Sequence, residues 1–227
     1  YLQPPLAERH SLLPFADTRE LRKRSKEIKR SSCEVAEKLW HALLASDTKH
    51  VSQLADELEP HELAVCARWK RRDLATDLVQ EVDEATPPFG ETLLHAAAFA
   101  GHVGLLGQLL GAGARVSQTG QQSCCTALHA AAAGGNPEAC ERLLAAGCRV
   151  GALSAGKRSA LYIACLKGFH DVARALVAAG ADPYASPSGG EAVMSLLRRL
   201  GGPAAALIPI FDEVSRAAAA ATKEAAA

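Results

Sequence analysis

Two histidines, His95 and His129, have neighbours that could assist them in chemistry. Glu91 lies four residues before His95 and Cys125 lies four before His129, so Cys125 and His129 would share one face of a helix. A zinc site needs four converging ligands, and a thiol nucleophile needs a base and an orienting third group. No spacing in the sequence supplies either set. We therefore expect no catalytic residue, no cofactor site and no metal site, and a structural role for both histidines.

The cysteines and the glycine-rich stretches also favour structural roles. The seven cysteines are an odd number without a C-x-x-C pair, and most lie in alanine-rich helical patterns: Cys33, Cys66, Cys124, Cys125, Cys140, Cys148 and Cys165. This predicts free thiols in the cytoplasm or another reducing compartment, with the nucleus and organelles left open. The glycine-rich stretches at 111–113 and 134–135 lack the preceding strand and following lysine of a phosphate loop, so we interpret them as turns.

A repeat of 33 to 34 residues must position all of these residues. Thr92, Thr126 and Ser159 keep this spacing, and two sets of glycines keep it too: Gly101, Gly135 and Gly168, then Gly113, Gly147 and Gly180. Three independent sets of residues with one period indicate stacked repeats.

Each unit is predicted to be a helix, a tight turn and a second helix. In the first unit the first helix covers about 93–100 and ends at a glycine. The second helix has leucines at helical spacing from 105 to 110. In the second unit, Asn136-Pro137 is typical of an N-cap followed by proline at the first helical position. We expect Leu110 and Leu144 to fill the seam between units.

These segments resemble the ankyrin repeat family. The family motif T-P-L-H-x-A is matched by 92–97, 126–131 and 159–164, and L-L-x-x-G-A by 109–114, 143–148 and 176–181. The motif's proline is absent from all three units, and the third has Tyr162 in place of histidine. The resemblance implies an all-α fold, an ankyrin-type helical solenoid of about five to six stacked helix pairs. It also implies that the motif histidine ties the threonine to neighbouring backbone.

The expected domain organisation is an extended, basic arm at 1–30, the solenoid at 31–215 and an alanine-rich tail at 216–227. The clear repeats are 90–123, 124–157 and 158–190. Degenerate helix pairs are expected on both sides, at 34–58 with a turn at Ser46-Asp47, at 60–82 with a turn at Trp69-Lys70, and at 190–213 around Gly201-Gly202. Pro203 and Pro209 are expected to disturb the last helix.

Charge and hydropathy limit the classes of function that the chain can have. The chain has 25 basic and 25 acidic residues, so no strongly basic face is expected for nucleic acid. Residues 19–30 alone carry seven basic and two acidic residues. Three interpretations of this arm stay open: a solvated arm, a docking arm for an acidic protein or RNA surface, and a nuclear-import signal. No run of 18 apolar residues predicts a membrane span. The chain begins with Tyr1, so a processed N-terminus stays open.

The predicted function is a non-enzymatic protein–protein interaction scaffold, including as a subunit of a larger assembly. A nucleic-acid-associated subunit that contacts phosphates through 19–30 is the alternative. By the resemblance, a partner binds on the concave face and loop tips, at Glu91, Phe99, Arg115, Cys125, Arg149, Lys157, Arg158, Leu166 and Lys167. Phe99 and Leu166 would be apolar anchors. Arg115, Arg149, Lys157 and Arg158 would form a basic edge for an acidic partner segment. No small-molecule substrate is expected.

Overall fold

The computed structural model describes residues 32–45, 47–69, 92–120, 124–184, 192–201, 205, 207–213 and 216. Its helices are a helical segment at 32–44, α2 Thr48–Asp56, α3 Pro60–Cys66, α4 Leu93–Ala100, α5 Val103–Gly111, α6 Ala127–Gly134, α7 Pro137–Ala145, α8 Ala160–Lys167, α9 His170–Ala178, α10 Val193–Leu200 and a helical segment at 207–213. The arm at 1–30 and the tail from 217 lie outside these residues.

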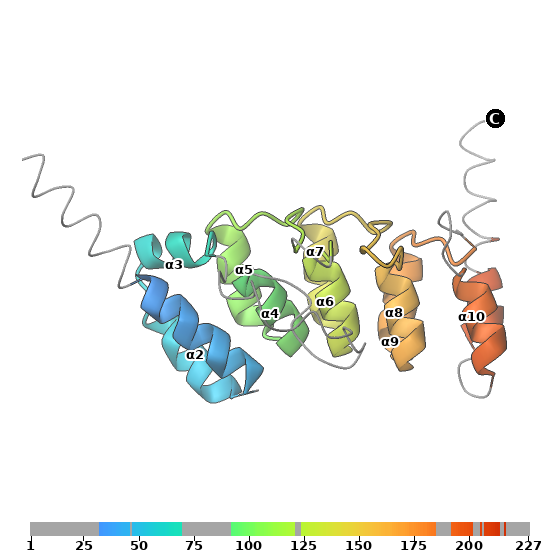
Figure 1. Cartoon of the computed structure of the whole chain (residues 1–227), viewed down its shortest axis with the longest axis horizontal. Helices are drawn as coiled ribbons and strands as arrows, with labels where there is room; N and C mark the ends of the chain where they lie inside the picture. Colours follow the sequence, from blue (N-terminus) through green and yellow to red (C-terminus); the bar gives the residue numbers. More distant parts are fainter. Residues whose placement is uncertain are drawn as a thin grey trace, which may run out of the picture.

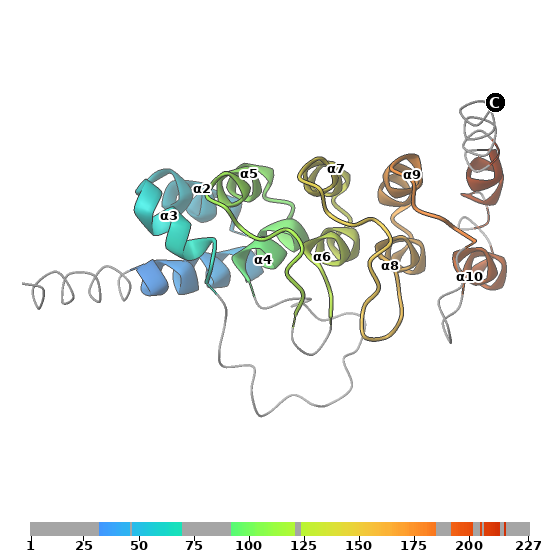
Figure 2. The ribbon, with the colours of Figure 1, turned by 90° about the horizontal axis from the view of Figure 1, so that it is seen from above.

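The helices stand side by side as paired layers along one axis (Figure 1). Seen from above, α4, α6, α8 and α10 form one row and α5, α7 and α9 form a second row behind it (Figure 2). Contacts run along both rows, from α4 to α6 to α8 to α10 and from α2 to α5 to α7 to α9. Helices of eight or nine residues are unstable alone, so their stability comes from this stacking. The predicted all-α solenoid is confirmed, with five helix pairs within the described residues.

We call α4, α6, α8 and α10 the inner helices and α5, α7 and α9 the outer helices. Each outer helix ends in the same way. Gly113, Gly147 and Gly180 have φ of +85°, +85° and +90°, which only glycine adopts without strain. The amide of the next residue donates to a carbonyl five residues back: Ala114 to Leu109, Cys148 to Leu143 and Ala181 to Leu176, each at 2.9 Å. This pattern satisfies carbonyls that a helix end otherwise leaves unpaired.

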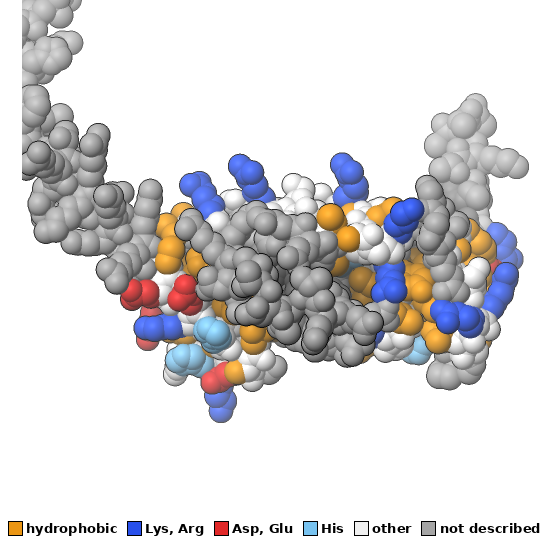
Figure 3. Space-filling model, in the orientation of Figure 1, with side chains coloured by type: hydrophobic (Ala, Val, Ile, Leu, Met, Phe, Trp, Pro, Cys, Tyr) orange, Lys and Arg blue, Asp and Glu red, His pale blue; other side chains and the backbone are white. Residues whose placement is uncertain are grey.

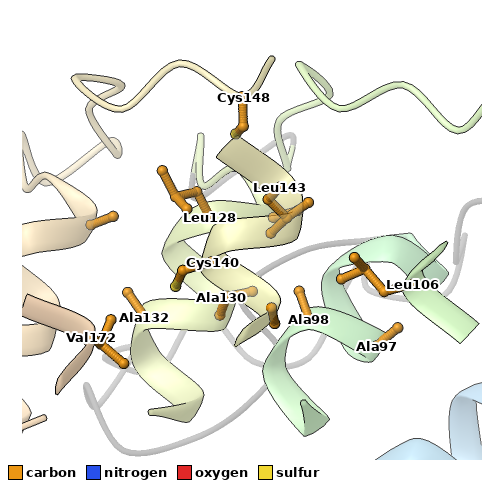
Figure 4. Packing of buried hydrophobic residues seen from close by; sticks show 14 of the residues in the cluster. Ala97, Ala98, Leu106, Leu128, Ala130, Ala132, Cys140, Leu143, Cys148 and Val172 are labelled. Atoms are coloured by element: carbon orange, nitrogen blue, oxygen red, sulfur yellow. The ribbon is translucent and has the colours of Figure 1, made fainter. Parts of the chain in front are cut away.

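Alanines lie between the inner helices, and leucines from both rows of helices, Leu106, Leu128 and Leu143, pack beside them (Figure 4). Ala97, Ala98, Ala130 and Ala132 are buried, which allows the inner helices to approach closely. The prediction for Leu110 and Leu144 was wrong by one position. Both are only half-buried, and Leu109 and Leu143 are the fully buried leucines.

In the described part of the N-terminal region, the segment 32–44 and α2 form one layer, and the helix pair predicted at 60–82 is described only as far as residue 69. The segment 32–44 and α2 pair around the predicted turn, and α2 packs directly on α5, with Ser52 Oγ 3.3 Å from His102 Nε2. The described part of the predicted 60–82 pair, α3, does not separate α2 from α5. Instead α3 also packs on α5, and beyond its end Trp69 stacks on Trp40 at 5.7 Å between ring centroids. The second helix predicted for 60–82 falls in 70–91, outside the described residues.

The C-terminal layer follows the prediction except at one proline. α10 ends before Gly201, and a second helical segment covers 207–213. This segment continues through Pro209, because Leu207 and Phe211 on either side are buried in the core and hold the helix in place. Pro203 lies outside the described residues.

Candidate partner-binding surface

The two motif histidines join neighbouring layers. His95 Nδ1 lies 2.7 Å from Thr92 Oγ1, and its Nε2 lies 3.1 Å from the carbonyl oxygen of Cys125 in the next unit. His129 repeats this arrangement, with Nδ1 2.9 Å from Thr126 Oγ1 and Nε2 3.1 Å from the carbonyl oxygen of Arg158. The structural role predicted for both is confirmed, and it extends further than the local contact that the family motif implied. We call the two contacts the histidine bridges.

The hydrogen bonds define the protonation state of His129. The Thr126 amide donates to Nδ1 at 3.1 Å, so Nδ1 accepts and Nε2 carries the proton that it donates to the Arg158 carbonyl. Burial lowers the pKa of His129 to about 4, because desolvation disfavours the imidazolium. The neutral ring is therefore the structural form at neutral pH. Both ring nitrogens have partners, which leaves neither for a metal or a thiol.

The third unit replaces the histidine bridge. The Tyr162 amide donates to Ser159 Oγ at 3.2 Å, and the Tyr162 ring lies 5.8 Å from the guanidinium carbon of Arg158. Arg158 therefore serves two layers, through its carbonyl oxygen to His129 and through its side chain to Tyr162. A cation over an aromatic ring is attracted to the ring face.

Asn136 holds two layers together from an unexpected direction. It occupies the predicted N-cap position before Pro137, but its side chain does not cap α7. Its Nδ2 instead donates to the carbonyl oxygens of Phe99 at 2.7 Å and Ala98 at 3.2 Å, at the end of α4 in the preceding unit. A Cβ at Gly134 would overlap the Phe99 carbonyl, so this approach requires glycine.

The loops between units present the predicted basic residues. Arg115 and Arg149 are exposed at equivalent positions, directly after the helix-ending motif of α5 and α7. The second loop is a tight hairpin in which Leu153 and Ser159 form a single antiparallel bridge. The Ser154 amide donates to the Arg158 carbonyl at 2.9 Å, and Lys157 has a φ of +56° at the tip. Arg149, Lys157 and Arg158 thus lie in one loop.

The predicted apolar anchors lie at the other end of the inner helices. Phe99 and Leu166 are half-buried at the ends of α4 and α8, and Lys167 follows Leu166. The equivalent positions of α6 are small: Ala133, which is buried, and Gly134. The structure therefore divides the predicted site in two, a basic edge on the loops and a shallow apolar strip at the helix ends.

Cys125 is a correction to the predicted surface. Its side chain is 4% exposed, so it faces the core, and its backbone carbonyl accepts from His95. The position before the motif threonine belongs to the bridge between layers. Glu91, at the equivalent position of the first unit, lies outside the described residues.

Leu153 is an exposed apolar residue that the sequence analysis missed. Its side chain is 43% exposed at the base of the second loop, beside the strand position that leads to Arg158. A leucine within a loop of small and polar residues was the signal that could have identified it.

The cysteines are free thiols, and five of the seven are buried. Burial raises the pKa of Cys140 and Cys165 to about 12, so both remain protonated at neutral pH.

Among the described residues, no three His, Cys, Asp or Glu side chains converge to hold a metal ion. In the same part of the chain, no helix has the length and apolar character to cross a membrane.

Comparison with known proteins agrees with the geometry of the layers. A family model described as ankyrin repeats (3 copies) matches residues 63–152 and 94–186, which together span more than half of the chain. This chain belongs to the ankyrin repeat family. No curated protein matches it. Ankyrin repeats are protein–protein interaction modules.

Proposed function

We propose that this chain is a non-enzymatic scaffold that binds a partner protein through its loop edge and the exposed ends of its inner helices. The proposal rests on a difference between two sets of side chains, those that join the layers and those that differ between units. The motif threonine and histidine of the first two clear units are buried, and the histidines bond to the next layer in the histidine bridges. Phe99 and Leu166, which differ between units, lie half-buried at equivalent places at the ends of α4 and α8.

Such an arrangement suits recognition. A backbone held by stacking is rigid, so binding loses little conformational entropy. Variable side chains on that backbone can change partner without changing the fold. The chain fits a subunit of a larger assembly as well as a free adaptor, and both need the same surface.

The test is partner capture by paired variants. Phe99→Ala with Lys157→Glu alters both parts of the surface, and Arg115→Glu with Arg149→Glu alters only exposed loop residues. Each is compared with Arg174→Ala on the outer helix α9, whose side chain faces solvent beside Asp171. We expect both surface variants to lose the partners captured by the unaltered chain, with unchanged helical circular dichroism. Equal capture by all of the chains would contradict the proposal.

A further inference from the structure

The layers from α4 to α10 segregate their charges. On the outer helices α7 and α9, acidic and basic residues alternate: Glu138, Glu141, Arg142, Asp171 and Arg174. The described loops and inner helices carry one acidic residue, Asp182, against these basic residues: Arg115, Arg149, Lys157, Arg158, Lys167, Arg198 and Arg199. In Figure 3 most acidic side chains lie at the N-terminal end on the left, while basic ones line the upper edge and the right. A chain with no net charge therefore has a locally basic surface.

The second loop combines charge with an apolar contact. Arg149 and Lys157 are exposed, and Arg158 is half-buried with its side chain over Tyr162. Leu153 is exposed at the base of the same hairpin, and the bridge to Ser159 fixes its place relative to Arg158. An exposed apolar side chain in the same loop as three cations fits a partner that is anionic and also carries an apolar group.

We infer that the partner segment is an extended acidic peptide whose bulky apolar side chain contacts Leu153, with its carboxylates beside Arg149, Lys157 and Arg158. This inference rests on the proposed function and names the chemistry of its partner. Arginine pairs with carboxylates through its planar fork, and complementary charge accelerates encounter. Arg115, at the equivalent position of the preceding unit, extends the basic edge for a longer segment.

A peptide fits this surface better than a nucleic acid does. Recognition of single strands uses aromatic side chains on which bases stack. The described parts of the two basic loops, 112–120 and 146–159, contain no aromatic residue. Their large exposed apolar residue is a leucine, which packs against an aliphatic or aromatic side chain.

The experiment measures fluorescence anisotropy with defined probes. The main probe is a labelled 16-residue peptide of Glu and Asp with one central Leu, and the second has Ser in place of that Leu. The unaltered chain should bind the first more tightly than the second, and both less tightly as salt rises. Arg149→Glu with Lys157→Glu should weaken binding at least tenfold. Leu153→Ser should remove the preference for the Leu peptide.

The matched control reverses the same number of charges on the outer helices. Arg142→Glu with Arg174→Glu changes the net charge by the same amount, because each double variant replaces two basic residues by two acidic ones. Binding within twofold of the unaltered chain is expected. Equal weakening by the two double variants would overturn the inference, because net charge rather than the loop would then govern binding.

Two further outcomes separate this inference from the proposed function. Tighter binding of a labelled 20-nucleotide single-stranded RNA through the same loop residues would replace the peptide by a nucleic acid and overturn the inference. If the acidic peptide does not bind, but the variants of the proposed function still lose their partners, the scaffold stands and the partner chemistry is wrong. If those variants keep their partners, the partner-binding surface given under the proposed function is contradicted.

Discussion

The central layers and the N-terminal layer use different means to join the same stack. From α4 to α9, small residues and the repeated histidine bridges connect equivalent positions. In the layer of 32–69, α2 and α3 contact α5, and large side chains pack inside the layer: Trp40 is fully buried, and Trp69 packs on it. The stability of the central layers depends on interactions that repeat. The end layer has one neighbour, and its stability depends on large buried side chains. This suggests that the end layer unfolds more independently.

The largest effect is expected from Trp40→Ala. Removing this buried side chain should cost about 3–5 kcal/mol, as for other buried aromatic residues. Since each layer of a solenoid contacts only its neighbours, the loss should open the N-terminal layer alone. Limited proteolysis should then cleave within 32–69 and leave a helical fragment from 92 onward. A single transition that unfolds the whole chain would contradict the comparison.

Leu143→Ala tests the central layers in the same way. Leu143 is fully buried beside the seam, so its loss should cost about 2–5 kcal/mol, measured by urea unfolding. Leu144→Ala is the matched control, because the half-buried neighbour loses fewer contacts and should cost less than half as much. If both variants lose the same free energy of unfolding, Leu143 is not the leucine that fills the seam.

The histidine bridge of His129 predicts a dependence of stability on pH. Its pKa is about 4 in the folded chain and 6.5 ordinarily, so the unfolded chain binds more protons between these values. Stability should therefore fall as pH falls from 6.5 to 4, by about 3 kcal/mol in total at about 1.4 kcal/mol per pH unit. His41 and His50 of the N-terminal layer are exposed and take no part in such a bridge.

Urea unfolding at pH 7, 5.5 and 4.5 measures this dependence. His129→Gln removes the titrating group, so its stability should be lower at pH 7 and decline less over the same interval. The same decline in the variant and the unaltered chain would show that the bridge does not contribute.

Two glycine substitutions should change the stability of the chain in opposite directions. Gly134→Ala places a methyl group against the Phe99 carbonyl and should cost about 1–3 kcal/mol. Gly107→Ala lies within α5, where the nearest atom to the new methyl is Arg142 Nη1 at 3.6 Å. There alanine should stabilise the chain by about 0.5–1 kcal/mol, because it favours the helix. Thermal melting of both variants checks the prediction, and equal shifts would contradict it.

The sequence predicted the layers well because the period identifies equivalent residues. The spacing of Gly101, Gly135 and Gly168 placed the turns, and the three helix ends followed. The period does not say which atoms meet across layers. The contact of Asn136 with α4 and the burial of Cys125 both depend on a neighbouring unit, so neither could be read from one unit alone.

The N-terminal layer was harder to predict for the same reason. Its sequence shares no motif with the central units, so its helices were found but not their arrangement. The position of α3 on α5 depends on packing between residues far apart in the chain, including Trp40 and Trp69. For the surface, charge and family position identified the basic loop. The sequence offers Leu153 as a leucine among small and polar residues, but its bridge position next to Arg158 required the hairpin geometry.

Hydrogen–deuterium exchange most directly tests the central claim, that a rigid stack binds a partner through its loops and not through its outer helices. The full chain is measured alone and with a saturating amount of the acidic Leu peptide. We predict slower exchange in the loop 146–159 on binding, with no change in the outer helices α7 and α9. Protection confined to α7 and α9, or a general loss of protection across α4 to α9, would contradict the account.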